Sequence, residues 1–131
     1  MTLRIAGAAL LAAIALAPAG AVGLGPLTHE GATASDRKGF YLTLINPYPA
    51  QERFRLYAVG WDDEAPVARV KIPVKSVVLG PKSQRRLLVI DTELAPGEVH
   101  RFRVCAERVE SNEKAMIHAR VCSKLVARRR G

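Results

Sequence analysis

The sequence lacks the motifs that mark the common classes of enzyme. It contains no GxSxG or HExxH motif, no glycine-rich phosphate loop and no paired carboxylates in an obvious cleft arrangement. Ser83 and Ser111 fall in predicted turns and have no base near them in the sequence. We therefore predict a protein that is not an enzyme and that needs no cofactor.

Isolated polar residues do not add a catalytic or metal site. Asp62-Asp63-Glu64 is acidic, but it lies in a loop beside Pro66, where a solvated turn is favoured over a calcium site. Asp91 and His100 stand alone in the sequence and are interpreted as surface residues. No metal site is predicted.

Long apolar runs are absent after the N-terminus. Residues 1–21 have the three parts of a secretory signal: Arg4, an apolar stretch from Ile5 to Leu16, and small residues at Ala17-Pro18-Ala19 and Ala19-Gly20-Ala21. An uncleaved anchor is the alternative, because weakly apolar residues continue further. Proline and glycines interrupt that stretch, however, and a spanning helix needs roughly 20 good helical residues. We predict cleavage, a periplasmic location and no stable membrane insertion.

The remaining residues, 22–131, have the size of one domain. The net charge of the chain is +8, and loss of the one charge of Arg4 would leave +7. A basic surface favours acidic partners, and export argues against nucleic acid. The basic residues are spread along the predicted strands and end in Arg128-Arg129-Arg130, so a solvated face with a charged tail is the simplest interpretation.

Alternation of apolar and polar residues dominates the chain, and helical periodicity is nearly absent. Strands are predicted over 40–45, 53–61, 67–74, 77–79, 85–90, 99–109 and 115–127, with room for one irregular first strand in 23–38. About seven short strands separated by turn signals predict an all-β, immunoglobulin-like sandwich in a single domain. Phe54, Trp61 and Phe102 are interpreted as core residues.

The two cysteines fall in the last predicted hairpin, on the polar side of their own strands. If the chain folds back around residues 113 and 114, Cys105 lies directly across from Cys122, at a spacing that allows a disulfide. An oxidising compartment would close that bond. A metal or redox site is the alternative, but there is no CxxC pair, and His29, His100 and His118 do not complete a tetrahedral ligand set.

Three segments, taken in order, carry a family resemblance. The first is Leu42-Thr43-Leu44-Ile45-Asn46, followed by a proline turn and residues 54–61. The second is Ile72-Pro73-Val74, followed by a turn and a basic strand at 79–86. The third is Cys122-Ser123-Lys124-Leu125-Val126-Ala127-Arg128. Together they resemble the N-terminal domain of the periplasmic chaperones of chaperone–usher pilus assembly.

The resemblance implies that the last strand is an edge strand donated to the incomplete fold of an exported, pilin-like subunit. By position, Ile117, Ala119 and Val121 would be the inserted residues, and Lys124 would hold the subunit's C-terminal carboxylate. An outer-membrane usher is a further candidate partner. A disulfide between the last two strands occurs in a branch of this family, which fits the two cysteines.

Three departures favour an alternative. The family's second domain has no counterpart before Gly131, and His29 is the only basic residue where the family has an arginine on its first strand. The donor series is also small, with alanines in place of bulky aliphatic residues. The alternative is a secreted immunoglobulin-like adaptor or structural module without strand donation, in which Lys124 is an ordinary exposed lysine.

Overall fold

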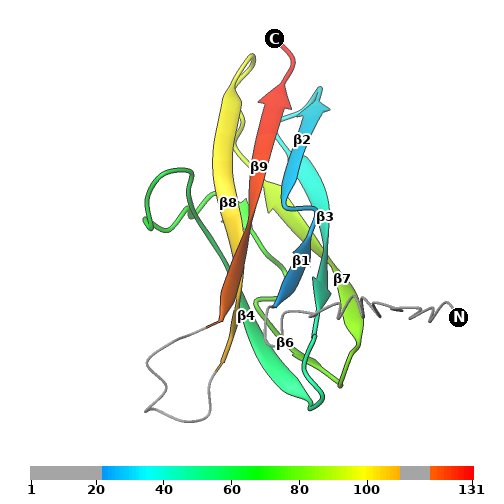
Figure 1. The fold of residues 1–131 in the computed structure, drawn as a ribbon. Coiled ribbons are helices and arrows are strands. Elements are labelled where there is room, and N and C mark those ends of the chain that lie inside the picture. The colour runs from blue at the N-terminus through cyan, green and yellow to red at the C-terminus, as the bar shows by residue number, and fades with distance from the viewer. Residues whose placement is uncertain (1–21, 110–118) are drawn as a thin grey trace, which may run out of the picture.

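The computed structural model describes residues 22–109 and 119–131 (Figure 1). The predicted signal peptide, residues 1–21, and the candidate binding residue Ile117 lie outside the described residues. The strands are β1 (Gly23–Gly25), β2 (Thr28–Thr33), β3 (Lys38–Ile45), β4 (Glu52–Gly60), β5 (Val70–Lys71), β6 (Ser76–Leu79), β7 (Gln84–Asp91), β8 (Val99–Arg108) and β9 (Arg120–Arg129). Within this described part of the chain, no helix is long and apolar enough to cross a membrane.

The strands form two sheets, in the orders β1-β3-β7-β5 and β2-β9-β8-β4-β6. The predicted all-β sandwich is therefore confirmed. The described part holds more strands than the predicted seven, because the irregular N-terminal segment splits into β1 and β2. The chain changes sheets between them: β1 pairs antiparallel with β3, whereas β2 pairs parallel with β9. Pro26 lies at the crossing, where its missing N–H costs no ladder bond.

The core lies between the sheets and follows the alternation in the sequence. Phe40, Leu42 and Leu44 of β3 face inward and are buried, as are Phe54 of β4 and Phe102 of β8. Each such side chain contributes about 1.5–3 kcal/mol when it leaves water. Alternation therefore predicts the buried faces of these long strands correctly.

The turn after β3 is organised by one buried side chain. The Asn46 side-chain amide donates to the carbonyls of Ala50, Leu79 and Gly80, and its oxygen accepts from the N–H of Tyr48. A buried amide is stable only when such bonds are made. Asn46 thereby ties the turn after β3 to the end of β6.

Two sequence interpretations of the core and turns were wrong or incomplete. Trp61 is partly exposed and lies outside the core, in the loop that follows β4. The segment 67–74 forms only the two-residue strand β5, because the chain leaves the sheet of β4 there, pairs briefly with β7 in the other sheet and returns to β6.

Candidate functional site

The last two strands are joined as the sequence predicted. Cys105 of β8 is paired with Cys122 of β9, and the two form a disulfide. Cys105 is fully buried, between Tyr57 of β4 on one side and Cys122 on the other, although its position in the strand alternation is on the polar side. The bond fixes the register of β9 on β8 beside the residues predicted to bind a subunit.

One edge of β9 is open only in its first part. β8 pairs with β9 over Arg120–Arg128, and β2 covers the opposite edge from Lys124 to Arg129 (Figure 1). The backbone N–H of Lys124 already donates to the carbonyl of Leu27. Among the described residues, no strand covers Arg120–Ser123 on that side. The expected edge strand is thus present over Arg120–Ser123 and was wrong for Lys124–Arg129.

Two of the predicted apolar donor residues are described: Ala119 lies just before β9, and Val121 lies on the inner side of β9. Ala119 and Val121 are partly buried and pack against the core, followed by the fully buried Ser123. The hydroxyl of Ser123 donates to the carbonyl of Pro26, just before β2 begins. The two apolar side chains are therefore held beside the open edge.

Lys124 points from the other side of β9, away from the core. Its ammonium nitrogen lies 4.8 Å from the centre of the Trp61 ring, within the range of a cation–π contact. A pocket of about 240 Å³ surrounds this pair, lined by Thr28, His29, Glu30, Trp61, Lys124 and Val126. The structure therefore adds Trp61 to the predicted site, a residue that sequence reasoning placed in the core.

Two arginines on the outer face of β8 and β9 bind an acidic residue of the same chain. Arg120 donates to both carboxylate oxygens of Glu64, each at 2.8 Å, and to the hydroxyl of Tyr57. Arg103 donates to the same carboxylate at 3.2 Å. The hydrogen bond from Arg120 lowers the pKa of Glu64 to about 2, with a smaller contribution from Arg103. The loop predicted as a solvated turn therefore neutralises part of the basic sheet face.

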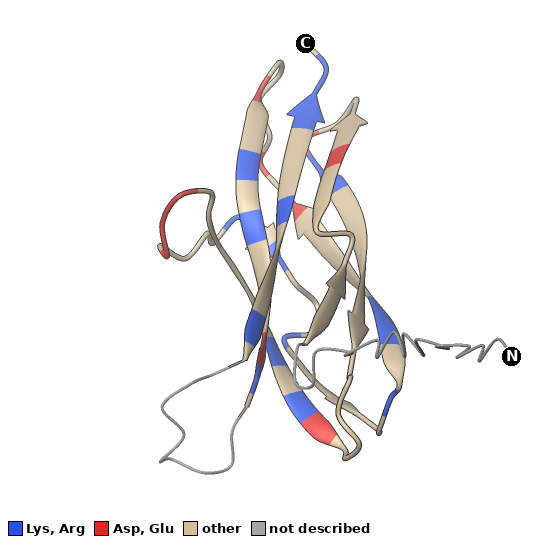
Figure 2. Cartoon of the chain, viewed as in Figure 1, with Lys and Arg blue, Asp and Glu red and all other residues tan. Residues whose placement is uncertain are grey.

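Lys124 does not share in this neutralisation. Glu64 is bound by the two arginines, and Glu30, which lines the same pocket, pairs with Arg128. Within 22–109 and 119–131, Lys124 is in no ion pair. Arg103 lies directly opposite Lys124 on β8 and adds to the local positive charge. Figure 2 shows the bands of basic residues along β8 and β9.

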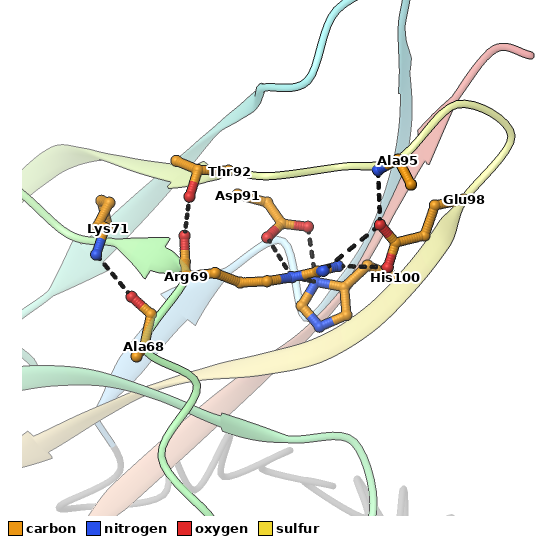
Figure 3. Close-up of polar contacts among 8 residues, drawn as sticks. All are labelled: Ala68, Arg69, Lys71, Asp91, Thr92, Ala95, Glu98 and His100. Carbon is orange, nitrogen blue, oxygen red and sulfur yellow. Dashed lines mark hydrogen bonds and ion pairs between the residues drawn. The ribbon is translucent and has the colours of Figure 1, made fainter.

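A second polar cluster joins the end of β7 to the start of β8 (Figure 3). Asp91 is fully buried, and its carboxylate lies 2.7 Å from Nδ1 of His100 and 3.5 Å from Nε of Arg69. Arg69 also binds Glu98 at 2.8 Å. Burial raises the pKa of Asp91, while the hydrogen bond from His100 and the charge of Arg69 oppose that rise. The interpretation of Asp91 as a surface residue was therefore wrong.

This cluster is best explained as structural. The backbone carbonyl of Arg69 accepts from both the N–H and the hydroxyl of Thr92, and Glu98 accepts from the N–H of Ala95. These bonds tie the segment before β5 to the loop between β7 and β8. In the described part of the chain, no group of acidic, histidine or cysteine side chains is arranged to hold a metal ion.

Comparison with known proteins identifies the fold. No protein-family model matches the sequence, and no curated protein matches it. The solved structures with similar folds include the SafB chaperone of Salmonella enterica, in complex with the SafA pilin, at 20% identity and a TM-score of 0.68. They also include CsuC, from the chaperone–usher Csu pili of Acinetobacter baumannii, at 13% identity and a TM-score of 0.64.

The extent of the match differs between neighbours. The comparison covers 83% of this chain and 54% of SafB, and 84% of this chain and 52% of CsuC, so the chain spans about half the length of these chaperones. A PapD-like domain of human CEP192 matches at 15% identity and a TM-score of 0.62, over 82% of this chain and 84% of that one. The chain therefore has the fold predicted from its resemblance to the pilus chaperones.

Proposed function

We propose that this protein is a periplasmic chaperone module that binds an exported, pilin-like subunit through the open edge of β9. The observation that carries the proposal is the edge at Arg120–Ser123, which ends at Lys124, a residue with no acidic partner among the residues that the structure describes. The fold shared with the pilus chaperones supports it. An unpaired strand edge offers N–H and C=O groups to which another chain can add a strand.

The geometry limits how such a strand can lie. A strand added beside Arg120–Ser123 must stop near Lys124, because β2 occupies the edge beyond it and Leu27 already accepts from the Lys124 N–H. A strand parallel to β9 would bring its C-terminal carboxylate to Lys124, whereas an antiparallel strand would bring its positive N-terminus there. The charge of Lys124 favours the parallel strand, with a charge-assisted bond to the carboxylate.

The inner side chains complete the proposed contact. Ala119 and Val121 lie beside the open edge and would enter the groove of the subunit, as would Ile117. Both described residues are small, so the apolar contribution is modest. Each alanine forgoes about 1.5–3 kcal/mol of burial relative to a buried leucine. An outer-membrane usher as a second partner belongs to the same proposal.

Hydrogen exchange tests the proposal at single amides. Lys124 and Arg130 donate their N–H groups toward β2, and Ala119 accepts from β8, so the even-numbered residues face the open edge. Adding a peptide that copies the C-terminus of a pilin-like subunit should slow exchange at Arg120 and Cys122. Val121 and Ser123 face β8 and serve as internal controls. Unchanged exchange at Arg120 and Cys122 under saturating peptide would contradict strand addition.

The second candidate function is an immunoglobulin-like adaptor or structural module that donates no strand. Two observations favour it. β2 covers most of one edge of β9. The PapD-like domain of CEP192, which is not described as a chaperone, matches over most of its own length. Under this alternative, Lys124→Ala leaves partner binding intact. A large loss of affinity for the subunit peptide in that variant would exclude it.

A further inference from the structure

Trp61 is held in place by the loop that carries it. A Cβ at Gly60 would lie 2.1 Å from a carboxylate oxygen of Asp63, so the Asp63 side chain packs directly against Gly60. The same Asp63 carboxylate accepts from the N–H of Ala65, and Glu64 is bound by Arg103 and Arg120. The indole thus projects from the loop after β4 and reaches Lys124 on β9, with β8 between these two strands.

The pocket beside the indole has the parts of a recognition site for a chain end. Lys124 supplies a cation without an acidic partner among the described residues, and Trp61 and Val126 supply partly exposed apolar surface. The open edge of β9 leads directly to this pocket, because it ends at Lys124. An anion with an attached apolar group complements such a site, and a C-terminal residue with an apolar side chain has both.

We propose that Trp61, with Val126, takes the last side chain of the bound subunit and so selects a C-terminal residue with an aromatic or large aliphatic side chain. This inference rests on the proposed function, because it assumes a carboxylate at Lys124. Trp61 thereby becomes a specificity-determining residue. A terminal glycine leaves the pocket unfilled, whereas a terminal phenylalanine packs on the indole, a contact that aromatic pairs favour.

Synthetic peptides test the inference. The probe is an acetylated peptide of alternating threonine and valine that ends in phenylalanine with a free carboxylate. Matched peptides end in glycine, or carry a C-terminal amide. Trp61 is the single tryptophan of the chain, so its fluorescence reports binding. We expect the phenylalanine peptide to bind about tenfold more tightly than the glycine peptide, the ratio that 1.4 kcal/mol gives.

Titration calorimetry on variants of the full chain shows which residues produce the preference for the phenylalanine peptide over the glycine peptide. Trp61→Ala should reduce it to near unity, and Trp61→Phe should retain most of it. Val126→Ala removes apolar surface from the pocket without changing the loop that carries Trp61, and it should weaken the preference for phenylalanine. Tyr41→Ala is the matched control, since Tyr41 is an exposed aromatic residue on the other sheet, stacked with Arg86, and it should leave the preference unchanged.

Two contrary results separate the inference from the function beneath it. If Trp61→Ala and Val126→Ala keep the full preference for phenylalanine while the amide peptide binds weakly, the pocket assignment fails and strand binding stands. If acid and amide peptides bind equally and Lys124→Met changes nothing, the carboxylate site itself fails, and the proposed function with it. A preserved amide NMR spectrum establishes that each variant is folded.

Discussion

Arg120 and Glu64 form a two-point ion pair across 56 residues of sequence, each oxygen of the carboxylate accepting one bond of 2.8 Å. This pair attaches the loop after β4 to the outer face of β9. Because the same loop carries Trp61, the ion pair also holds the indole over Lys124. One acidic side chain thus links the basic sheet face to the proposed binding pocket.

The first prediction concerns the pKa of Glu64. Its folded value of about 2 lies below the ordinary 4.5, so the stabilisation from this carboxylate is present above 4.5 and is lost as the pH falls through about 2. Arg120→Gln should raise the pKa toward 4.5, as followed by NMR of the carboxyl carbon. Arg101→Gln, a change at an exposed arginine of β8, should leave it near 2. An unchanged pKa in the Arg120 variant would contradict the assigned cause.

The disulfide gives the second prediction. It closes a loop with a sequence separation of 17, for which the restriction of the unfolded chain stabilises the fold by about 3 kcal/mol. The double variant Cys105→Ala and Cys122→Ala should lose about that much free energy of unfolding in guanidinium denaturation. The wild-type protein in a reducing agent is the control and should show a similar loss. Equal midpoints with and without the reductant would show that the bond adds no stability.

Much of the fold follows from local patterns in the sequence. The inward residues of β3, β4 and β8 are predictable because side chains alternate across a strand. The pairing of Cys105 with Cys122 follows from the same alternation, once the turn is placed between them. Both inferences need only neighbouring strands, which sequence patterns describe well.

The remaining features depend on distant segments. β2 is mostly exposed and shows no apolar alternation, so nothing in Thr28–Thr33 predicts its parallel pairing with β9. Trp61 was assigned to the core because a large apolar residue is usually buried, and its contact with Lys124 requires the whole loop to fold across β8. The burial of Asp91 could not be predicted either, because its partners Arg69 and His100 come from separate segments of the sequence.

The third prediction concerns Asp91. Burial raises its pKa, so the folded chain holds the proton more tightly than the unfolded chain. The contribution of this group to stability is therefore complete below 3.8, its ordinary value, and is lost as the pH rises through the raised pKa. Asp91→Asn should flatten that decline in the free energy of unfolding measured against pH. A decline of the same slope in the variant would assign it to another group.

A second variant tests the effect of Arg69, whose charge opposes the rise in the pKa of Asp91. The charge of Arg69 lowers the pKa of Asp91 against the effect of burial, so Arg69→Met should raise that pKa further. NMR of the Asp91 carboxyl carbon measures the change directly. A fall in the pKa would show that Arg69 does not stabilise the charged form.

The fourth prediction tests whether small donor residues limit subunit binding. Ala119 packs at the margin of the core beside the open edge, so Ala119→Leu adds apolar surface where a subunit groove would meet it. Each buried CH₂ group is worth about 0.8 kcal/mol, and we expect at least a tenfold gain in affinity for a pilin-like acceptor by titration calorimetry. Arg101→Leu adds a similar side chain on the outer face and is the control. Two results would contradict the prediction: equal affinities of the two variants, or an Ala119→Leu variant that binds no more tightly than the wild type. In either case Ala119 does not enter the acceptor, and the contact depends on the backbone edge and Lys124 alone.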